Sequence, residues 1–326
     1  RGNKIPMAVN ANKPERWKAD IAQSVDFYND WFMHFAPKAY RDTRVETTRQ
    51  VLSALEKTTA LTNISPDILA QNPFVLPILR MSTAPPIARD RLTGLAGISP
   101  NLVKAMEIDH RIPPRMDRDT VTLELQKIGQ IIIRLVDADI FSWLEPGQSP
   151  SETEMHRAAT IVADRLCGAV ADPIIRNAQE QRQLAAIQHW LEQRSYHLIE
   201  TGDKVSFNQM KPGTFTFRLN VPVKQASRAK PVNIPIDTVI MPHRSQPGDL
   251  PLLIEAKSAG DFTNTNKRRK EEATKVAQLR STYGERVRFV LFLCGYFDSG
   301  YLGYEAAEGI DWVWEHRLDD LAEFGL

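Results

Sequence analysis

Two carboxylates and a lysine stand close together in the second half of the sequence. Asp237 lies within the apolar stretch 233–240, and Glu255 and Lys257 lie in the next apolar stretch, 252–257. Residues two apart on a strand point to the same face, and strands joined by a short loop can lie side by side. We therefore expect Asp237 near Glu255, where the paired carboxylates suit Mg²⁺ and the lysine assists an attacking water. This pattern predicts metal-assisted hydrolysis of a phosphodiester.

A purely structural interpretation of the same residues stays open. In that interpretation Asp237 ends a strand at a turn, and Glu255 and Lys257 form a surface pair across two strands. Asp237 is, however, flanked by apolar residues such as Ile236 and Val239. A carboxylate in an apolar strand is costly to bury unless something binds it, which favours the metal site.

Basic residues are concentrated around this motif although the chain as a whole is nearly neutral. The sequence has 41 Lys and Arg against 40 Asp and Glu, which leaves a formal net charge of +1. Residues 204–230 nevertheless hold six basic and no acidic residues, and residues 261–288 hold eight basic against four acidic residues. The densest cluster is Lys267, Arg268, Arg269 and Lys270. Such a cluster can bind phosphates or reach guanine edges in the major groove, although a solvated helix start remains the alternative.

The sequence predicts two domains. Before the Pro- and Gly-containing linker at 145–150, apolar residues recur at helical spacing, so residues 1–145 are expected to form an all-α domain. After the linker, the period changes to that of short strands, so residues 150–326 are expected to form an α/β domain with a mixed sheet. Helices are expected at 17–35, 43–61, 120–144, 154–166, 173–194 and 267–283, and strands at 196–200, 214–223, 232–241, 250–257 and 288–294.

A second DNA-binding pattern lies in the helical half, at residues 88–106. Gly97 falls at the turn between two short segments with helical periodicity, which is typical of a helix-turn-helix. In that arrangement Ser99, Asn101 and Lys104 face the groove at the start of the recognition helix. Two packed helices with a glycine C-cap are the structural alternative for the same residues.

The motif residues resemble those of a known nuclease superfamily. Pro-Ile-Asp at 235–237 and Glu-Ala-Lys at 255–257 are similar to the PD-(D/E)xK signature of restriction-endonuclease-like nucleases, with the proline one position early. The resemblance implies a restriction-endonuclease-like α/β core in which Asp237 and Glu255 bind metal and Lys257 serves the nucleophilic water.

A carboxylate from a preceding helix often completes the site in that superfamily. By this resemblance Glu180 is the candidate, with Glu192 on the same helix as the second choice.

Longer stretches are similar to one family within the superfamily, the XamI family of type II restriction endonucleases. These stretches are residues 8–14, 267–278, 289–298 and 300–312. The resemblance implies a Mg²⁺-dependent enzyme of a restriction-modification system that cuts double-stranded DNA at a palindrome, GTCGAC in the case of the namesake, and that is accompanied by a cognate DNA methyltransferase. A palindrome is read most simply by a two-fold dimer, so we expect a homodimer.

Other features of the sequence limit where the protein works. Cys167 and Cys294 stand alone, which argues against a disulfide scaffold or a zinc site and favours a reducing cytoplasm. The resemblance to restriction enzymes implies that this is the cytoplasm of a prokaryote. The longest apolar runs, such as 289–294, are far shorter than the roughly 20 residues that span a bilayer. The chain begins at Arg1 with no apolar segment following, so we interpret it as a truncated start rather than a signal peptide.

Two other functional classes stay open at this point. The same superfamily contains DNA repair and structure-specific nucleases, which share the metal site but cut without a discrete pattern on plasmid DNA. The non-enzymatic alternative is a DNA-binding protein that uses the helix-turn-helix segment beside an inactive nuclease fold.

Overall fold

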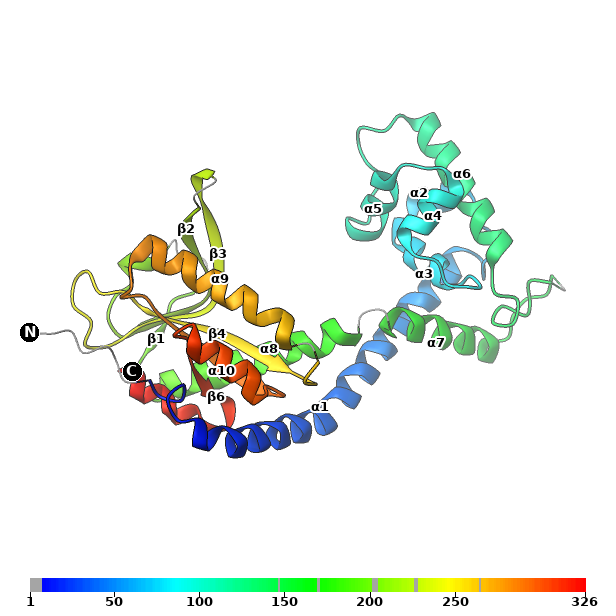
Figure 1. Ribbon diagram of the computed structural model, residues 1–326. Helices are drawn as coiled ribbons and strands as arrows, with labels where there is room; N and C mark the ends of the chain where they lie inside the picture. The colour runs from blue at the N-terminus through cyan, green and yellow to red at the C-terminus, as the bar shows by residue number, and fades with distance from the viewer. Residues whose placement is uncertain (1–7, 146, 169–170, 201–204, 226–227, 264) are drawn as a thin grey trace, which may run out of the picture. The chain divides into compact units, whose positions relative to one another are not determined.

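The computed structural model describes residues 8–145, 147–168, 171–200, 205–225, 228–263 and 265–326. The chain forms two compact units (Figure 1). A helical unit comprises Pro37–Ile174, and a sheet unit combines Arg1–Ala36 with Ile175–Leu326. The units therefore divide the chain at other points than the linker at 145–150 that the sequence indicates.

The helical unit contains short helices around one apolar core. Its elements are the second half of α1 (Pro14–Lys57), α2 (Pro66–Gln71), η1 (Pro73–Val75), α3 (Leu76–Met81), α4 (Arg89–Ala96), α5 (Pro100–Ile108), α6 (Arg118–Leu135) and α7 (Glu152–Gly168). Ser65 and Ser99 cap α2 and α5 through their side chains, as their positions before proline predict. Helix α6 ends before the predicted residue 144, because Val136 turns to an extended conformation and pairs with Thr83.

Helix α1 is continuous where the sequence predicts two helices, at 17–35 and 43–61. Pro37 lies between the two predicted helices, and proline lacks the backbone N–H that a helix interior uses. The helix nevertheless runs through Pro37, and its first half belongs to the sheet unit.

The sheet unit is built on a mixed sheet of six strands, which confirms the mixed α/β architecture. The strands are β1 (His197–Leu198), β2 (Thr214–Gln225), β3 (Arg228–Met241), β4 (Leu252–Ala259), β5 (Arg288–Gly295) and β6 (Asp311–Trp314), in this order across the sheet. Strand β3 is antiparallel to β2 and β4, whereas β4, β5 and β6 are mutually parallel. The parallel strands are connected through α9 (Thr265–Tyr283) and α10 (Ser299–Ala307), as parallel pairing requires.

Helices cover both faces of this sheet. Figure 1 shows α9 and α10 on the face toward the viewer and α8 (Ala171–Glu192) behind the strands. Alternate residues of β4 pack on the two sides: Leu253 shares a core with Leu279 of α9, and Ile254 shares the other core with Ile187 of α8. Glu255 and Lys257, which follow Leu253 by two and four positions, therefore also face α9.

Contacts between distant parts of the sequence attach the start of α1 to the sheet unit. The Asp311 side chain at the start of β6 accepts hydrogen bonds from the backbone N–H groups of Asn10 and Ala11, both at 3.0 Å. Ser24 of α1 accepts a hydrogen bond from the N–H of Gly295 at 2.8 Å. These long-range bonds explain why the compact units do not follow the linker in the sequence.

None of the helices within the described ranges is long and apolar enough to cross a membrane.

Candidate active site

The structure brings Asp237 and Glu255 together on neighbouring strands. β3 and β4 pair over residues 238–240 and 252–254. The two carboxylates lie at the same end of this paired segment, because Asp237 directly precedes it on β3 and Glu255 directly follows it on the antiparallel strand β4. Oδ2 of Asp237 accepts a hydrogen bond from the backbone N–H of Ala256 at 2.8 Å. The backbone pairing of the two strands ends at the carboxylates, and the Asp237 side chain takes over the contact with β4.

The electrostatic environment of Asp237 is unfavourable to a bare carboxylate. Burial raises the pKa of Asp237 to about 6, and the negative charge of Glu255 adds to this effect. The hydrogen bond from Ala256 and the positive charge of Lys257 act in the opposite direction. A pair of carboxylates in this state gains stability from a cation that both can bind.

Glu255 has one satisfied oxygen and one that is free. Its side chain is buried, and Oε1 accepts hydrogen bonds from Nζ of Lys257 at 3.1 Å and from Nζ of Lys275 at 2.7 Å. Oε2 is buried and has no hydrogen-bond partner among the described residues. A buried acceptor without a partner is costly, so this oxygen is suited to a ligand.

These residues fit a magnesium ion, although the protein supplies only part of the ligand set. Within the described ranges, no three His, Cys, Asp or Glu side chains gather in an arrangement that could hold a metal ion. Mg²⁺ commonly keeps several waters and takes only one or two protein carboxylates, with substrate phosphate as a further ligand. Asp237 and Glu255, with its unpaired oxygen, provide such a pair.

Lys257 lies between two carboxylates. Its Nζ is 3.1 Å from Oε1 of Glu255 and 3.1 Å from Oε1 of Glu272, which comes from α9. Burial by itself lowers the pKa of Lys257, but the charges of Glu255 and Glu272 outweigh burial and raise the pKa above its ordinary value. Lys257 is therefore a charged donor in this structure.

Glu272 and Lys275 are not among the site residues predicted from the sequence, which on this helix are the basic residues 267–270. Both lie on α9 three residues apart, on the face that buries Val276 and Leu279. The sequence does contain a pattern that indicates the position of Glu272. It lies seven residues before Leu279, so the two side chains share the apolar face of the helix. A charged residue at such a position indicates a buried partner.

Glu180 lies within electrostatic range of the site but is held by another residue. From α8, its Oε1 accepts hydrogen bonds from Nη2 of Arg218 at 2.7 Å and from Nε at 3.2 Å. The charge of Glu180 contributes to the raised pKa of Asp237. Glu192, the second choice, is exposed at the end of α8, where it bonds Gln188.

Arg218 interrupts the pairing of β2 with β3 beside Asp237. The ladder joins Phe217 to Thr238 and Leu219 to Ile236, and it omits the two residues between them. Arg218 has a left-handed φ of 52°, which is unusual for a residue with a side chain. The irregularity frees Asp237 from this ladder, and no local sequence signal indicates it.

The candidate DNA-binding residues fall in two places. Lys267, Arg268 and Arg269 belong to the first turns of α9, but their side chains lie outside the described part of the structure. Lys270 is exposed and borders an open hollow of about 460 Å³. The hollow is lined by Ile234, Lys270, Glu271, Thr274, Lys275 and Gln278.

Asn101 and Lys104 are exposed on α5 of the helical unit. Helix α4 ends at Gly97, whose φ of 57° is a left-handed C-cap, and Ser99 begins α5. Both a helix-turn-helix and a simple packed helix pair have this geometry, so the role of these residues stays a prediction.

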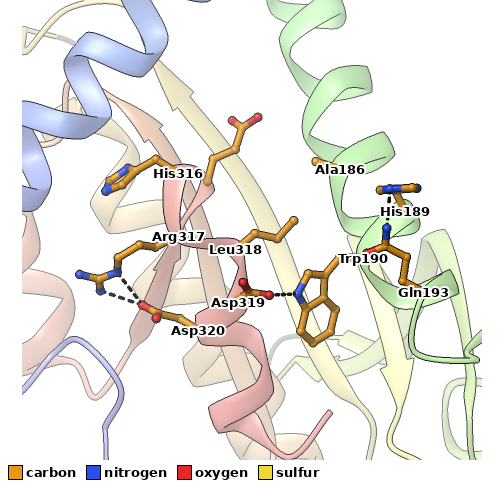
Figure 2. Close-up of a pocket in the computed structure, with 10 residues that line it drawn as sticks. Ala186, His189, Trp190, Gln193, His316, Arg317, Leu318, Asp319 and Asp320 are labelled. Atoms are coloured by element: carbon orange, nitrogen blue, oxygen red, sulfur yellow. Dashed lines mark hydrogen bonds and ion pairs between the residues drawn. The ribbon is translucent and has the colours of Figure 1, made fainter.

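A second hollow of the sheet unit, about 520 Å³ in volume, lies between α8 and η3 (Glu315–Phe324). Figure 2 shows that its polar side chains are largely paired with each other: Nε1 of Trp190 donates to Asp319 at 2.8 Å, and Arg317 binds Asp320 at 2.7 Å. None of the predicted site residues lines it.

Comparisons with known proteins show to which family the chain belongs. The model of the XamI restriction endonuclease family matches residues 59–314, which include Asp237, Glu255 and Lys257. The type II restriction enzyme SalI of Streptomyces albus G is 54% identical over 317 residues, covering 97% of this chain and 99% of that enzyme. A crystal structure of a Vibrio cholerae protein matches 78% of this chain and 54% of its own with 12% identity and a TM-score of 0.27. The family match and the extent of the identity to SalI show that this chain belongs to the XamI restriction endonuclease family.

Proposed function

We propose that this restriction endonuclease is a type II enzyme that cuts both strands of double-stranded DNA at the palindrome GTCGAC, using Mg²⁺ at the Asp237 and Glu255 site. The observation that carries the proposal is the pair of carboxylates where the pairing of β3 and β4 ends, with a buried oxygen of Glu255 that has no partner among the described residues. The target sequence follows from the family resemblance.

We also assign the sheet unit to the PD-(D/E)xK fold. Support comes from the order of elements around the motif. Asp237 lies on a strand antiparallel to β4, β4 carries Glu255 and Lys257, and α9 leads to the parallel strand β5. The proposed helical region, 1–145, and the proposed catalytic region, 150–326, correspond to the helical and the sheet unit, except that the first half of α1 belongs to the sheet unit and α7 to the helical unit.

Each residue of the site has a separate task in this proposal. Asp237 and Glu255 hold the cation, which when bound supplies positive charge to the phosphate as negative charge develops on it. Lys257 is a charged donor held within 3.1 Å of Glu255, so it orients the attacking water and stabilises charge at the phosphate. Glu180 orients water or a second cation, and Arg218 fixes its carboxylate.

DNA contacts are proposed for both units. Lys267, Arg268, Arg269 and Lys270 begin the helix whose Lys275 contacts Glu255, so they are suited to phosphates beside the site. Asn101 and Lys104 are exposed near the start of α5, where recognition helices contact base edges.

The enzyme is further proposed to act as a homodimer in the prokaryotic cytoplasm, together with a cognate DNA methyltransferase. A two-fold dimer presents one catalytic site to each strand of a palindrome. Methylation of the same sequence would protect the host DNA.

Plasmid cleavage tests the proposal. Wild-type protein with Mg²⁺ is expected to give discrete fragments whose ends map to GTCGAC, and EDTA is expected to abolish them. Asp237→Asn and Glu255→Gln should bind the same DNA without cutting it. Glu285→Gln is the matched control, because Glu285 is 87% exposed and lies outside the site. Cleavage by both site variants would overturn the metal site, and a smear in place of fragments would overturn the sequence specificity.

A further inference from the structure

Two buried glutamates lie near Lys257 in addition to Glu255. Glu272 of α9 is 1% exposed and Glu305 of α10 is fully buried. They lie where these helices pack on the sheet, among residues such as Val276 and Leu302. Carboxylates in such surroundings are costly unless they are paired, so their presence calls for a function or a partner.

Glu272 has its partner in the active site. Its Oε1 lies 3.1 Å from Nζ of Lys257. The position of Glu272 is fixed by the packing of α9, because Val276 and Leu279, on the same face of the helix, are buried against the sheet. Glu272 therefore presents a fixed negative charge to the lysine.

The second buried glutamate, Glu305, lies within electrostatic range of Glu272. Burial raises the pKa of Glu305 to about 8, and the negative charge of Glu272 adds to the effect. The hydrogen bond with Tyr301 and the charge of Lys257 oppose it. Glu305 therefore favours its neutral form, and Glu272 is the member of the pair that contacts Lys257.

The need for such a charge arises from the competition at Glu255. Oε1 of Glu255 already receives both Lys257 and Lys275, at 3.1 and 2.7 Å. A cation bound by Glu255 would take up much of its negative charge and would repel both lysines. Lys257 then depends on another carboxylate to stay beside the reacting phosphate.

We propose that Glu272 is a positioning residue that holds Lys257 in place while Glu255 binds the cation. The inference rests on the roles proposed above for Glu255 and Lys257. Glu272 does not touch the substrate or the cation in this account, and it acts only through the lysine.

The first experiment separates cleavage from binding. Glu272→Gln keeps the shape of the side chain and removes its charge, and Glu271→Gln, the exposed neighbour on the same helix, is the matched control. With enzyme in excess over a duplex that the wild type cuts, Glu272→Gln is expected to cleave about 10–100-fold more slowly. Its Kd for that duplex in Ca²⁺, and the rate of Glu271→Gln, are expected to equal those of the wild type. A wild-type cleavage rate for Glu272→Gln would overturn the inference.

A thermal double-mutant cycle in metal-free protein shows whether Glu272 acts through Lys257. In the wild-type background, Glu272→Gln removes the partner of the lysine and should lower the Tm. In the Lys257→Met background, it removes a buried charge that has lost its partner and should raise the Tm. A fall of Tm in both backgrounds would mean that Glu272 has only a structural role, and it would overturn the inference.

The proposed function and this inference can fail separately. If Asp237→Asn, Glu255→Gln and Lys257→Met all cut DNA, the proposed site itself is wrong. If those three variants are inactive while Glu272→Gln cuts normally, the site stands and only the role of Glu272 is wrong.

Discussion

The carboxylate of Asp237 accepts a hydrogen bond from the backbone N–H of Ala256, 2.8 Å away. A side chain on β3 thus occupies the place that a backbone carbonyl would take if β3 and β4 continued to pair. Ala256 lies between Glu255 and Lys257, so this one bond ties the aspartate to both other members of the candidate site. The sheet itself fixes their relative positions.

The hydrogen bond between Asp237 and Ala256 predicts a trade-off between stability and activity at Asp237. Asp237→Asn keeps an acceptor for the Ala256 N–H and removes a buried charge, whose burial and repulsion from Glu255 raise the pKa of Asp237 to about 6. In EDTA at pH 8, we expect the variant to gain on the order of 1 kcal/mol in free energy of unfolding while losing cleavage. Urea denaturation of both proteins measures the gain. A less stable Asp237→Asn would show that the carboxylate contributes favourably without a cation.

Cation binding should stabilise the folded protein through the same two carboxylates. A ligand present at one hundred times its Kd adds about 2.7 kcal/mol to the free energy of unfolding. We expect the Tm of the wild type to rise with Mg²⁺ concentration, and that of Asp237→Asn and Glu255→Gln to stay constant. Calorimetric scans without DNA measure this directly. An equal rise in all three proteins would place the cation elsewhere.

Lys275 should compete with the cation for Glu255. Its Nζ donates to Oε1 of Glu255 at 2.7 Å and to the backbone carbonyl of Pro235 at 3.2 Å. A hydrogen bond between charged groups contributes about 1.5–3 kcal/mol, so Lys275→Met is expected to bind Ca²⁺ about tenfold more tightly. Titration calorimetry measures the affinity, with exposed Lys270→Met as the control on the same helix. Weaker binding by Lys275→Met would show that the lysine supports the site rather than competing for it.

Glu305 makes the stability of the protein dependent on pH. Its pKa is about 8 in the folded protein against an ordinary value of 4.5, so between these values the folded state binds the extra proton. The contribution of Glu305 to stability is therefore present below about pH 4.5 and is lost as the pH rises through about 8, by at most about 1.4 kcal/mol for each pH unit.

Glu305→Gln should remove that part of the pH dependence. At pH 9 the variant is expected to be more stable than the wild type, whereas at pH 5 the two should differ little. Urea denaturation across this range tests the expectation, with exposed Glu308→Gln on the same segment as the control. Identical pH profiles for Glu305→Gln and the wild type would contradict it.

Local patterns were sufficient to predict the centre of the sheet. β4, α9 and β5 appear close to their expected positions, because an apolar strand, a charged helix and a second apolar strand each have a clear period in the sequence. The N-caps at Ser65 and Ser99 were also predicted from neighbouring residues alone. The association of Asp237 with Glu255 followed from the short loop between their strands.

Features that depend on distant residues could not be predicted. β6 has four residues, of which Trp312, Val313 and Trp314 are all buried, so it shows no alternation. Arg218 adopts its left-handed backbone opposite Asp237, and only the pairing of β2 with β3 shows this. Glu272 reaches the site only because α9 packs against β4, which the sequence of the helix does not reveal.

The bonds between Asp311 and the backbone of Asn10 and Ala11 have a consequence for synthesis of the protein. Residues 8–36 are synthesised about 300 residues before their partner strand, which corresponds to on the order of tens of seconds at ordinary rates of translation. The helical unit, Pro37–Ile174, is continuous in the sequence and can fold while the chain is still growing. The sheet unit cannot be completed until β6 has been synthesised, so a chain that stops before β6 carries no assembled nuclease into contact with the DNA of its host.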